Sequence, residues 1–201
     1  ADGRLDRVEI IHPDDFAMPP GGLNIRLNDH PLSREARLHD FKRDAAVAYS
    51  RANALDKVIF KGGPRPRLGI VTTGKSYLDT RQALDELGID EARAGALGLA
   101  LYKVAMVWPF EPKRFLEFAR DLDLLMVVEE KRMIIEVEAK EELYSLAKRP
   151  VIVGKRDEKG EWLFPAKGAL EPTSIAVAIG QRLLAFAGDS ALKERLAKLE
   201  A

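Results

Sequence analysis

The chain has 201 residues, enough for one ordinary α/β domain with additional segments. Its 32 Lys and Arg residues balance 32 Asp and Glu residues, so no basic excess favours a nucleic-acid partner. Cysteine is absent, which excludes disulfides, thiolate catalysis and cysteine-ligated iron–sulfur or zinc centres within these residues and fits a cytoplasmic protein.

The N-terminal region has no targeting or membrane signal. No apolar stretch approaches the roughly 20 residues that cross a bilayer, and ADGRLDRVEI lacks the basic and apolar regions of a signal peptide. We therefore expect no membrane partner. The sequence opens without Met, as if in mid-sequence, and we expect it to be a piece of a longer polypeptide.

Residues 1–32 are rich in Pro and Gly, which break any hydrophobic period. We predict an extended segment that wraps the domain or links it to a neighbour. Ser33 is a suitable N-cap residue, and apolar residues follow it at spacings of three and four. This pattern predicts an amphipathic helix from 34 to about 54, which together with the linker KGGPRPR makes residues 33–66 a second segment.

From residue 67 onward, short apolar runs alternate with helical periods. The runs are rich in Val and Ile and are bounded by Gly, Pro or charges, as is typical of strands buried on both faces. The predicted strands are 68–73, 101–107, 124–129 and 150–154, and the predicted helices are 77–87, 112–121, 133–146 and one that begins near Pro172. This alternation predicts an α/β domain over 67–187 with helices on both faces of a sheet.

Two segments fall outside this alternation. The turn-rich residues 155–168 predict a hairpin or loop. Residues 188–201 predict a terminal helix or an added tail.

Residues 69–76, GIVTTGKS, match the P-loop pattern G-x-x-x-x-G-K-[ST]. In a true P-loop the four variable positions are loop residues whose amides turn toward phosphate. Here those positions read IVTT, and β-branched residues favour an extended backbone. The stretch therefore predicts a buried strand, a turn, and a helix that starts at Tyr77 with Ser76 as its cap. A nucleotide triphosphate hydrolase remains a third hypothesis behind the two given below.

The ends of two predicted strands supply the candidate ligand site. In α/β sheets the carboxyl ends of strands bind ligands, and a helix start favours an anion. The candidate residues are Thr73, Gly74, Lys75 and Ser76 from the first strand end and Glu129, Glu130 and Arg132 from the run VVEEKR. Lys75 and Arg132 would neutralise a phosphate, and Ser76 would donate a hydrogen bond. The structural alternative is a plain turn, with one Glu solvated and the other pairing with a cation or capping the next helix.

No catalytic site and no metal site is predicted. His12, His30 and His39 have no ligand spacing, and a G-x-S-x-G nucleophile elbow is missing. Trp108 and Phe110, in a Pro-containing turn, indicate an apolar packing or interface patch. The residues alone indicate a domain that supports chemistry located elsewhere.

Several stretches in order resemble the central region of indolepyruvate ferredoxin oxidoreductases, particularly the long fused bacterial proteins. They read RLGIVTTGKSYLDTRQALDELGI, LYKVAMVWPFEP, LLMVVEEKR and RPVIVGKRDEKGEW, and upstream MPPGGLNIR and ARLHDFKRDAAVAYSRAN extend the resemblance over about residues 8–186. The resemblance implies a transketolase C-terminal-like domain. Its fold is a three-layer α/β/α sandwich with a mostly parallel mixed sheet of about five strands, the fifth at 57–60 or 160–165.

The same resemblance implies a reaction for the parent protein. That family oxidatively decarboxylates aryl 2-oxoacids such as indolepyruvate to an acyl-CoA, carbon dioxide and reduced ferredoxin. It uses thiamine diphosphate, magnesium and iron–sulfur clusters, with coenzyme A as co-substrate. Because this chain has no cysteine and no GDG-type diphosphate site, we expect it to bind none of these cofactors alone. The resemblance thus implies an inactive accessory or interface domain.

The expected partners are other domains or subunits of the same oxidoreductase, with ferredoxin engaged through the parent. The oligomeric state stays open, a homodimer included. The alternative hypothesis is a stand-alone Rossmann-like module that binds an anionic metabolite without catalysis.

Overall fold

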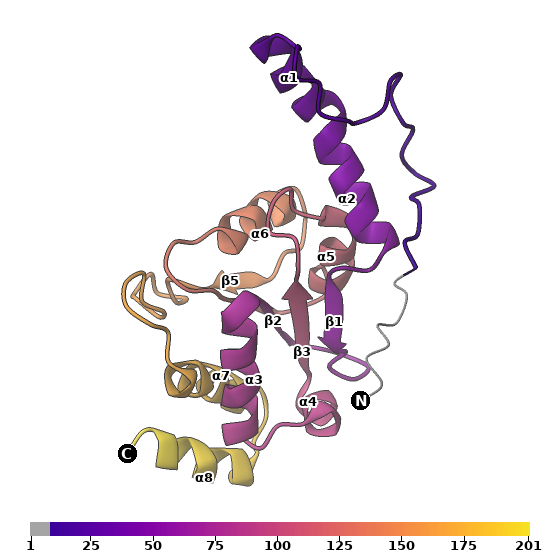
Figure 1. Ribbon diagram of the computed structural model, residues 1–201. Coiled ribbons are helices and arrows are strands. Elements are labelled where there is room, and N and C mark those ends of the chain that lie inside the picture. Colours follow the sequence, from indigo (N-terminus) through magenta and orange to yellow (C-terminus); the bar gives the residue numbers. More distant parts are fainter. Residues whose placement is uncertain (1–8) are drawn as a thin grey trace, which may run out of the picture.

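Five strands form one mixed sheet, in the order β1-β3-β2-β4-β5, in the computed structural model, which describes residues 9–201 (Figure 1). The strands are β1 (Lys57–Phe60), β2 (Leu68–Thr73), β3 (Leu99–Val104), β4 (Leu124–Val128) and β5 (Val151–Val153). Neighbours among β2 to β5 pair in parallel, whereas β1 pairs antiparallel with β3. The carboxyl ends of β2 to β5 and the start of β1 therefore lie at one end of the sheet, which we call the carboxyl end.

The four strands predicted from apolar runs are confirmed, with shifts of a few residues at some of their ends. The fifth strand lies at 57–60, the first of the two expected positions. Residues 160–165 instead contribute one isolated antiparallel bridge, between Arg156 and Trp162. β1 falls within the segment 33–66 and still completes the sheet, and the four segment boundaries stay a prediction.

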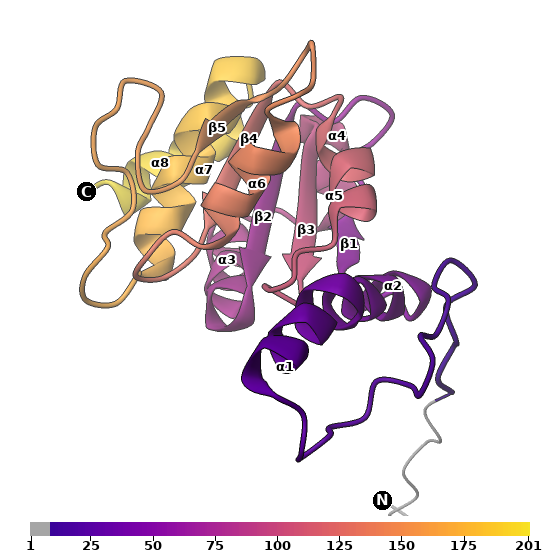
Figure 2. The same ribbon diagram turned by 90° about the horizontal axis from the view of Figure 1, so that it is seen from above.

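Helices cover both faces of the sheet, which confirms the three-layer α/β/α sandwich (Figure 2). The two cores follow from the alternation of side chains along each strand. Ile70 packs into the core formed with α3, α7 and α8, whereas Val71 packs into the core formed with α5 and α6. These helices are α3 (Gly74–Glu86), α5 (Pro112–Ala119), α6 (Ile135–Leu143), α7 (Pro172–Phe186) and α8 (Ser190–Leu199).

One helix, α4 (Glu91–Leu97), has no counterpart among the predicted elements. It begins after Asp90, whose carboxylate accepts a hydrogen bond from the backbone N–H of Arg93 at 2.8 Å, and it ends at Gly98 in the left-handed conformation. A helix of seven residues is too short to show a clear apolar period, so only these capping residues marked it.

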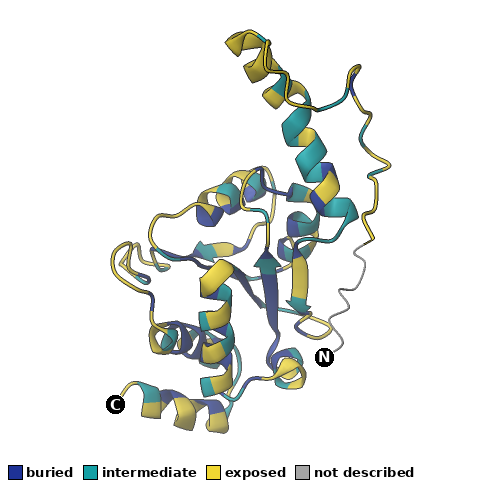
Figure 3. Ribbon diagram, viewed as in Figure 1, coloured by how far each residue is buried: buried dark blue, intermediate teal, exposed yellow. Residues whose placement is uncertain are grey.

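A helical arm projects from the α/β body (Figures 1 and 3). It consists of α1 (Pro31–Arg37), a π-helical turn η1 (Leu38–Lys42) and α2 (Arg43–Ala52), which follow one another without a break. The predicted long helix is thus confirmed, but Ser33 as its N-cap is wrong. His30 is the N-cap, because Pro31 already supplies the first helical position.

The outer half of the arm, α1 and η1, has no buried residue, whereas α2 buries Ala48 and Ser50. Residues 9–30 contain no helix or strand, in line with the predicted extended segment; the remainder of that prediction, residues 1–8, lies outside the described residues. The segment is tied back to α2 through Asn53, whose amide exchanges two 2.8 Å hydrogen bonds with the backbone of Ile11. Over the described residues, none of the helices is both long and apolar enough to span a bilayer.

Candidate functional site at the carboxyl end of the sheet

The turn between β2 and α3 lies at the carboxyl end of the central strand. Thr73 is the last strand residue, and its hydroxyl donates to the carbonyl of Val104 at 2.8 Å, so this side chain ties β2 to β3 and does not cap α3. Gly74 has a positive φ of 51°, and a Cβ there would meet no atom within 4 Å. The prediction that Ser76 caps the helix is wrong, because α3 begins two residues earlier and Ser76 is buried inside its first turn.

Lys75 is the exposed cation of this turn, and two carboxylates already neutralise it. Its Nζ lies 2.7 Å from Asp79 Oδ2 and 3.3 Å from Glu130 Oε1. The hydrogen bond to Asp79 raises the pKa of Lys75, and the bond to Glu130 adds to the effect. The hydrogen bond from the Leu170 N–H lowers the pKa of Glu130, with a further contribution from Lys75. An anion that binds here would have to compete for Lys75 with these two carboxylates.

Glu129 serves the next helix and not the β2–α3 turn. Its carboxylate accepts hydrogen bonds from three consecutive backbone N–H groups, those of residues 134–136, at 3.0, 3.0 and 3.1 Å. Glu129 is 5% exposed, so a buried carboxylate caps the start of α6 and its charge is favoured by the helix dipole. This is the structural alternative that the sequence left open for one of the two glutamates.

A buried lysine lies beside Glu129 and was not among the predicted site residues. Lys155 follows β5, is 2% exposed, and its Nζ donates to the carbonyl oxygens of Glu129 and, at 3.2 Å, Pro165. Its backbone N–H donates to Glu136 Oε2 at 2.8 Å, and Gly154 leaves room for that carboxylate, since a Cβ would lie 2.3 Å from Oε2. Burial lowers the pKa of the Lys155 amine, against the opposing effect of the glutamates nearby.

Of the seven candidate residues, the structure joins only Lys75 and Glu130 by a direct side-chain contact. Arg132 is exposed and forms no ion pair or hydrogen bond with another described residue, so it does not complete a cationic pair with Lys75. The preceding Lys131 has a positive φ of 57° and donates to the carbonyl of Gly168 at 2.5 Å. That contact holds the 129–135 loop against the 155–168 segment.

Trp108 and Phe110, from the same Pro-containing turn, lie in different surroundings. Trp108 is 53% exposed, with the Arg43 guanidinium 5.5 Å from its ring centroid, whereas Phe110 is 6% exposed and stacks edge-on against Phe115 in the core. Phe110 is thus a packing residue, one of the two expected roles, whereas a surface patch formed by Trp108 and Phe110 together is wrong. Over residues 9–201, no three His, Asp or Glu side chains gather in an arrangement that would hold a metal ion.

Comparison with known proteins identifies one family and a number of solved structures, two of which follow. The family model described as "Indolepyruvate oxidoreductase domain" matches residues 58–201, from β1 to the C-terminus, and leaves the helical arm outside the match. None of the curated proteins matches the chain.

The first solved structure is a split-gene transketolase in an inactive β4 tetramer, with 19% identity and a TM-score of 0.43 over 65% of this chain and 41% of that one. The second is a 2-oxoglutarate:ferredoxin oxidoreductase from Magnetococcus marinus with 2-oxoglutarate, coenzyme A and succinyl-CoA bound. Its identity is 15% and its TM-score is 0.46, over 78% of this chain and 24% of that one. The chain thus spans less than half the length of either protein.

Proposed function

The chain belongs to the indolepyruvate oxidoreductase domain family, and from that premise we propose that it is an accessory or interface domain of a 2-oxoacid:ferredoxin oxidoreductase. In this proposal the whole enzyme is cytoplasmic and oxidatively decarboxylates aryl 2-oxoacids such as indolepyruvate to acyl-CoA. It would do so with thiamine diphosphate and with ferredoxin as electron acceptor. The domain itself does not catalyse the reaction.

The observation that supports the accessory role is the state of the carboxyl end of the sheet. Glu129 is committed to the start of α6, and Lys75 and Glu130 neutralise one another. A general base must have a free lone pair within reach of substrate, and a nucleophile needs an adjacent base. In this turn region Glu129 is held by three backbone N–H groups, and Glu130 is held by Lys75 and the Leu170 N–H, so these side chains support structure and binding better than they support proton transfer.

The donor set also bears on the cofactors of the proposed enzyme. Iron–sulfur clusters are held by cysteine thiolates, and these 201 residues contain no cysteine. The magnesium of a thiamine diphosphate site takes oxygen ligands, and residues 9–201 offer no cluster of three candidate ligands. We propose that other domains or subunits of the same oxidoreductase hold these groups.

An activity assay tests the accessory role. The purified chain is supplied with indolepyruvate, coenzyme A, thiamine diphosphate, magnesium and a viologen dye as electron acceptor, alone and together with the thiamine-binding part of its parent polypeptide. We expect dye reduction only in the combined sample. Dye reduction by the chain alone would overturn the accessory role.

We further propose that the first turn of α3 contacts the anionic part of coenzyme A. The supporting features are the uncapped start of a 13-residue helix, the open space at Gly74 and the exposed amine of Lys75. Arg132 would approach only by moving its exposed side chain. The same turn would serve the alternative, a stand-alone module that binds an anionic metabolite, and the coding sequence that flanks the chain separates the two hypotheses.

Calorimetry with coenzyme A tests this contact, with Lys75→Ala as the variant. A matched control is Lys113→Ala, because Lys113 is also an exposed lysine in the first turn of a helix, but α5 is capped by the carboxylate of Glu111. We expect binding to weaken about fivefold in the first variant, as for one exposed ion pair, and to stay unchanged in the second. Equal binding by both variants, or no heat with the parent chain, would contradict the contact.

A further inference from the structure

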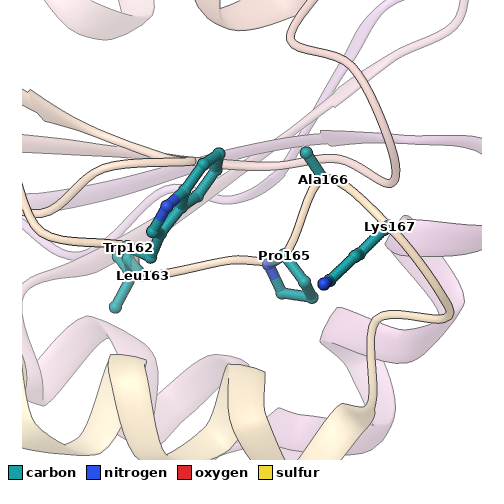
Figure 4. Close-up of a pocket in the computed structure, with 5 residues that line it drawn as sticks. All are labelled: Trp162, Leu163, Pro165, Ala166 and Lys167. Carbon is teal, nitrogen blue, oxygen red and sulfur yellow. The ribbon is translucent and has the colours of Figure 1, made fainter.

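The segment between β5 and α7 forms a hollow that none of the preceding proposals uses. It has a volume of about 580 Å³, within the usual range for small-molecule sites. Its lining residues are Trp162, Leu163, Pro165, Ala166 and Lys167 (Figure 4). Four of the five are apolar, and the fifth is a cation.

The segment that forms the hollow is held in place from several sides. Phe164 and Leu170, 1% and 2% exposed, anchor it in the core shared with α7. The backbone N–H of Leu163 donates to the carbonyl of Lys155 at 3.0 Å. At its tip, Arg182 forms two hydrogen bonds with the carboxylate of Glu158, at 2.9 and 2.7 Å. Because these contacts fix the segment, the hollow is preformed. Binding a ligand would therefore cost little free energy for ordering the segment.

Trp162 gives the hollow an aromatic wall. The side chain is 59% exposed, although the segment around it is fixed. The guanidinium of Arg156 lies 3.7 Å from its ring centroid, and Arg156 does not line the hollow, so it stacks on the part of the ring that faces away. In Figure 4 Trp162 stands on one side of the hollow and Ala166 and Lys167 on the other, with Pro165 between them. An aromatic ring placed there would stack on the indole.

The charge around the hollow is positive. The Lys167 side chain points back toward Pro165 in Figure 4, and its amine forms no ion pair with any other described residue. The amines of Lys131 and Lys155 reach the same segment from behind, where they donate to its backbone carbonyls. The hairpin also has three acidic side chains: Asp157 accepts from two backbone N–H groups at 2.9 Å each, Glu158 pairs with Arg182, and Glu161 is exposed, but none of them lines the hollow. A ligand with a negative charge is therefore favoured over a neutral one.

We propose that this hollow binds a planar aromatic anion, with its ring against Trp162 and Pro165 and its carboxylate or phosphate beside Lys167. Two kinds of molecule share this chemistry: an aryl carboxylate and a purine nucleotide. The inference stands apart from the accessory role and from the Lys75 contact, because it depends on other residues.

Binding experiments on the 201-residue chain distinguish the two sources. Phenylpyruvate and AMP are the complete probes, and each is titrated by calorimetry together with two partial probes. For phenylpyruvate these are benzyl alcohol, which lacks the anion, and pyruvate, which lacks the ring. For AMP they are adenosine, which lacks the anion, and ribose 5-phosphate, which lacks the ring. We expect at least one complete probe to bind and its partial probes to bind about fivefold more weakly or not at all. Binding by phenylpyruvate alone assigns the hollow to aryl acids, and binding by AMP alone assigns it to nucleotides.

Variants then locate the binding. Trp162→Ala removes the aromatic wall and should weaken binding about tenfold or more, and Lys167→Met should weaken it about fivefold. The matched control is Trp108→Ala, because Trp108 is the other tryptophan of the chain and is similarly exposed. In a Trp108→Phe background the fluorescence of Trp162 alone should respond to the bound probe.

Three results would overturn the proposal. The first is that neither phenylpyruvate nor AMP binds. The second is that binding persists undiminished in Trp162→Ala while the unfolding midpoint shows a folded chain. The third is that Trp108→Ala weakens binding as much as Trp162→Ala does.

Discussion

Two βα turns lie at the same end of the sheet and are built in opposite ways. The β2–α3 turn has a glycine with open space around it, an exposed lysine and no side-chain cap. The β4–α6 turn is sealed by the buried carboxylate of Glu129, and the buried amine of Lys155 lies against it. Both turns carry charged residues in sequence, so charge alone does not distinguish the proposed binding turn from the structural one. What distinguishes the two turns is whether their charged side chains form hydrogen bonds with buried backbone groups.

The largest effect expected from this contrast separates two adjacent glutamates. Glu129→Ala would leave three N–H groups of α6 without an acceptor and should lower the free energy of unfolding by about 2 to 3 kcal/mol. Glu130→Ala removes a partly buried partner of Lys75 and the acceptor of one backbone N–H, that of Leu170, and should therefore lower the free energy of unfolding by much less. Equal urea midpoints for the two variants would show that Glu129 does not stabilise the start of α6 by capping it.

The second contrast compares two glycines, one in each region. Gly154→Ala would drive a Cβ into the buried carboxylate of Glu136, which is already hydrogen-bonded, and should cost about 1 to 3 kcal/mol. Gly74→Ala meets no atom and should cost only the strain of its positive φ, about 1 kcal/mol. Thermal unfolding of both variants measures the difference. A larger loss at Gly74 would mean that the open space beside it is filled.

The third contrast concerns pH and Lys155. Because burial lowers the pKa of this amine below its ordinary 10.5, the unfolded chain binds more protons than the folded chain just below that pH. The free energy of unfolding should therefore rise with pH in this window, relative to that of Lys155→Met. Urea denaturation at several values from about pH 8 to pH 10 checks the sign. If the difference in free energy of unfolding between the parent chain and Lys155→Met stays constant or falls with pH, the amine lies in a solvated site.

The smallest effect is expected for Lys75→Ala. The Lys75 side chain is exposed in both of its ion pairs, although Asp79 and Glu130 are partly buried, and water screens the amine so that the pairs contribute little to stability. The urea midpoint should not change measurably, which makes this variant suitable for the calorimetry described above. A marked loss of stability would instead assign Lys75 to the structural group, with Glu129 and Lys155.

Much of the fold follows from the sequence because its signals are local. Apolar runs bounded by Gly, Pro or charges predicted four strands, and Pro172 indicated the start of one helix. The start of α3 was misplaced because Gly74 and Lys75 are usual turn residues, and only the structure shows that they already belong to the helix.

The candidate site was less predictable, because its contacts join distant parts of the chain. Glu129 and Glu130 are neighbours in sequence, yet they face different partners, and nothing local assigns either to α6 or to Lys75. Lys155 was missed for the same reason. The signal that could have identified it is a lysine directly after an apolar strand and a glycine, in the stretch PVIVGK.

The π-helical turn η1 has a consequence for how the arm meets a neighbour. A turn with i→i+5 hydrogen bonds holds one residue more than an α-helical turn, and each extra residue rotates the side chains beyond it by roughly 100°. Leu32 and Leu38 are both exposed, whereas Ala48 in α2 is buried, so these two apolar side chains of the outer arm are free of contact with the α/β body. The base of the arm is tied to the start of α5 by the ion pair between Arg51 and Glu111, and its tip lies roughly 18 Å farther out along the helix axis. A neighbour that binds the tip would therefore contact side chains whose direction depends on the π turn between tip and base.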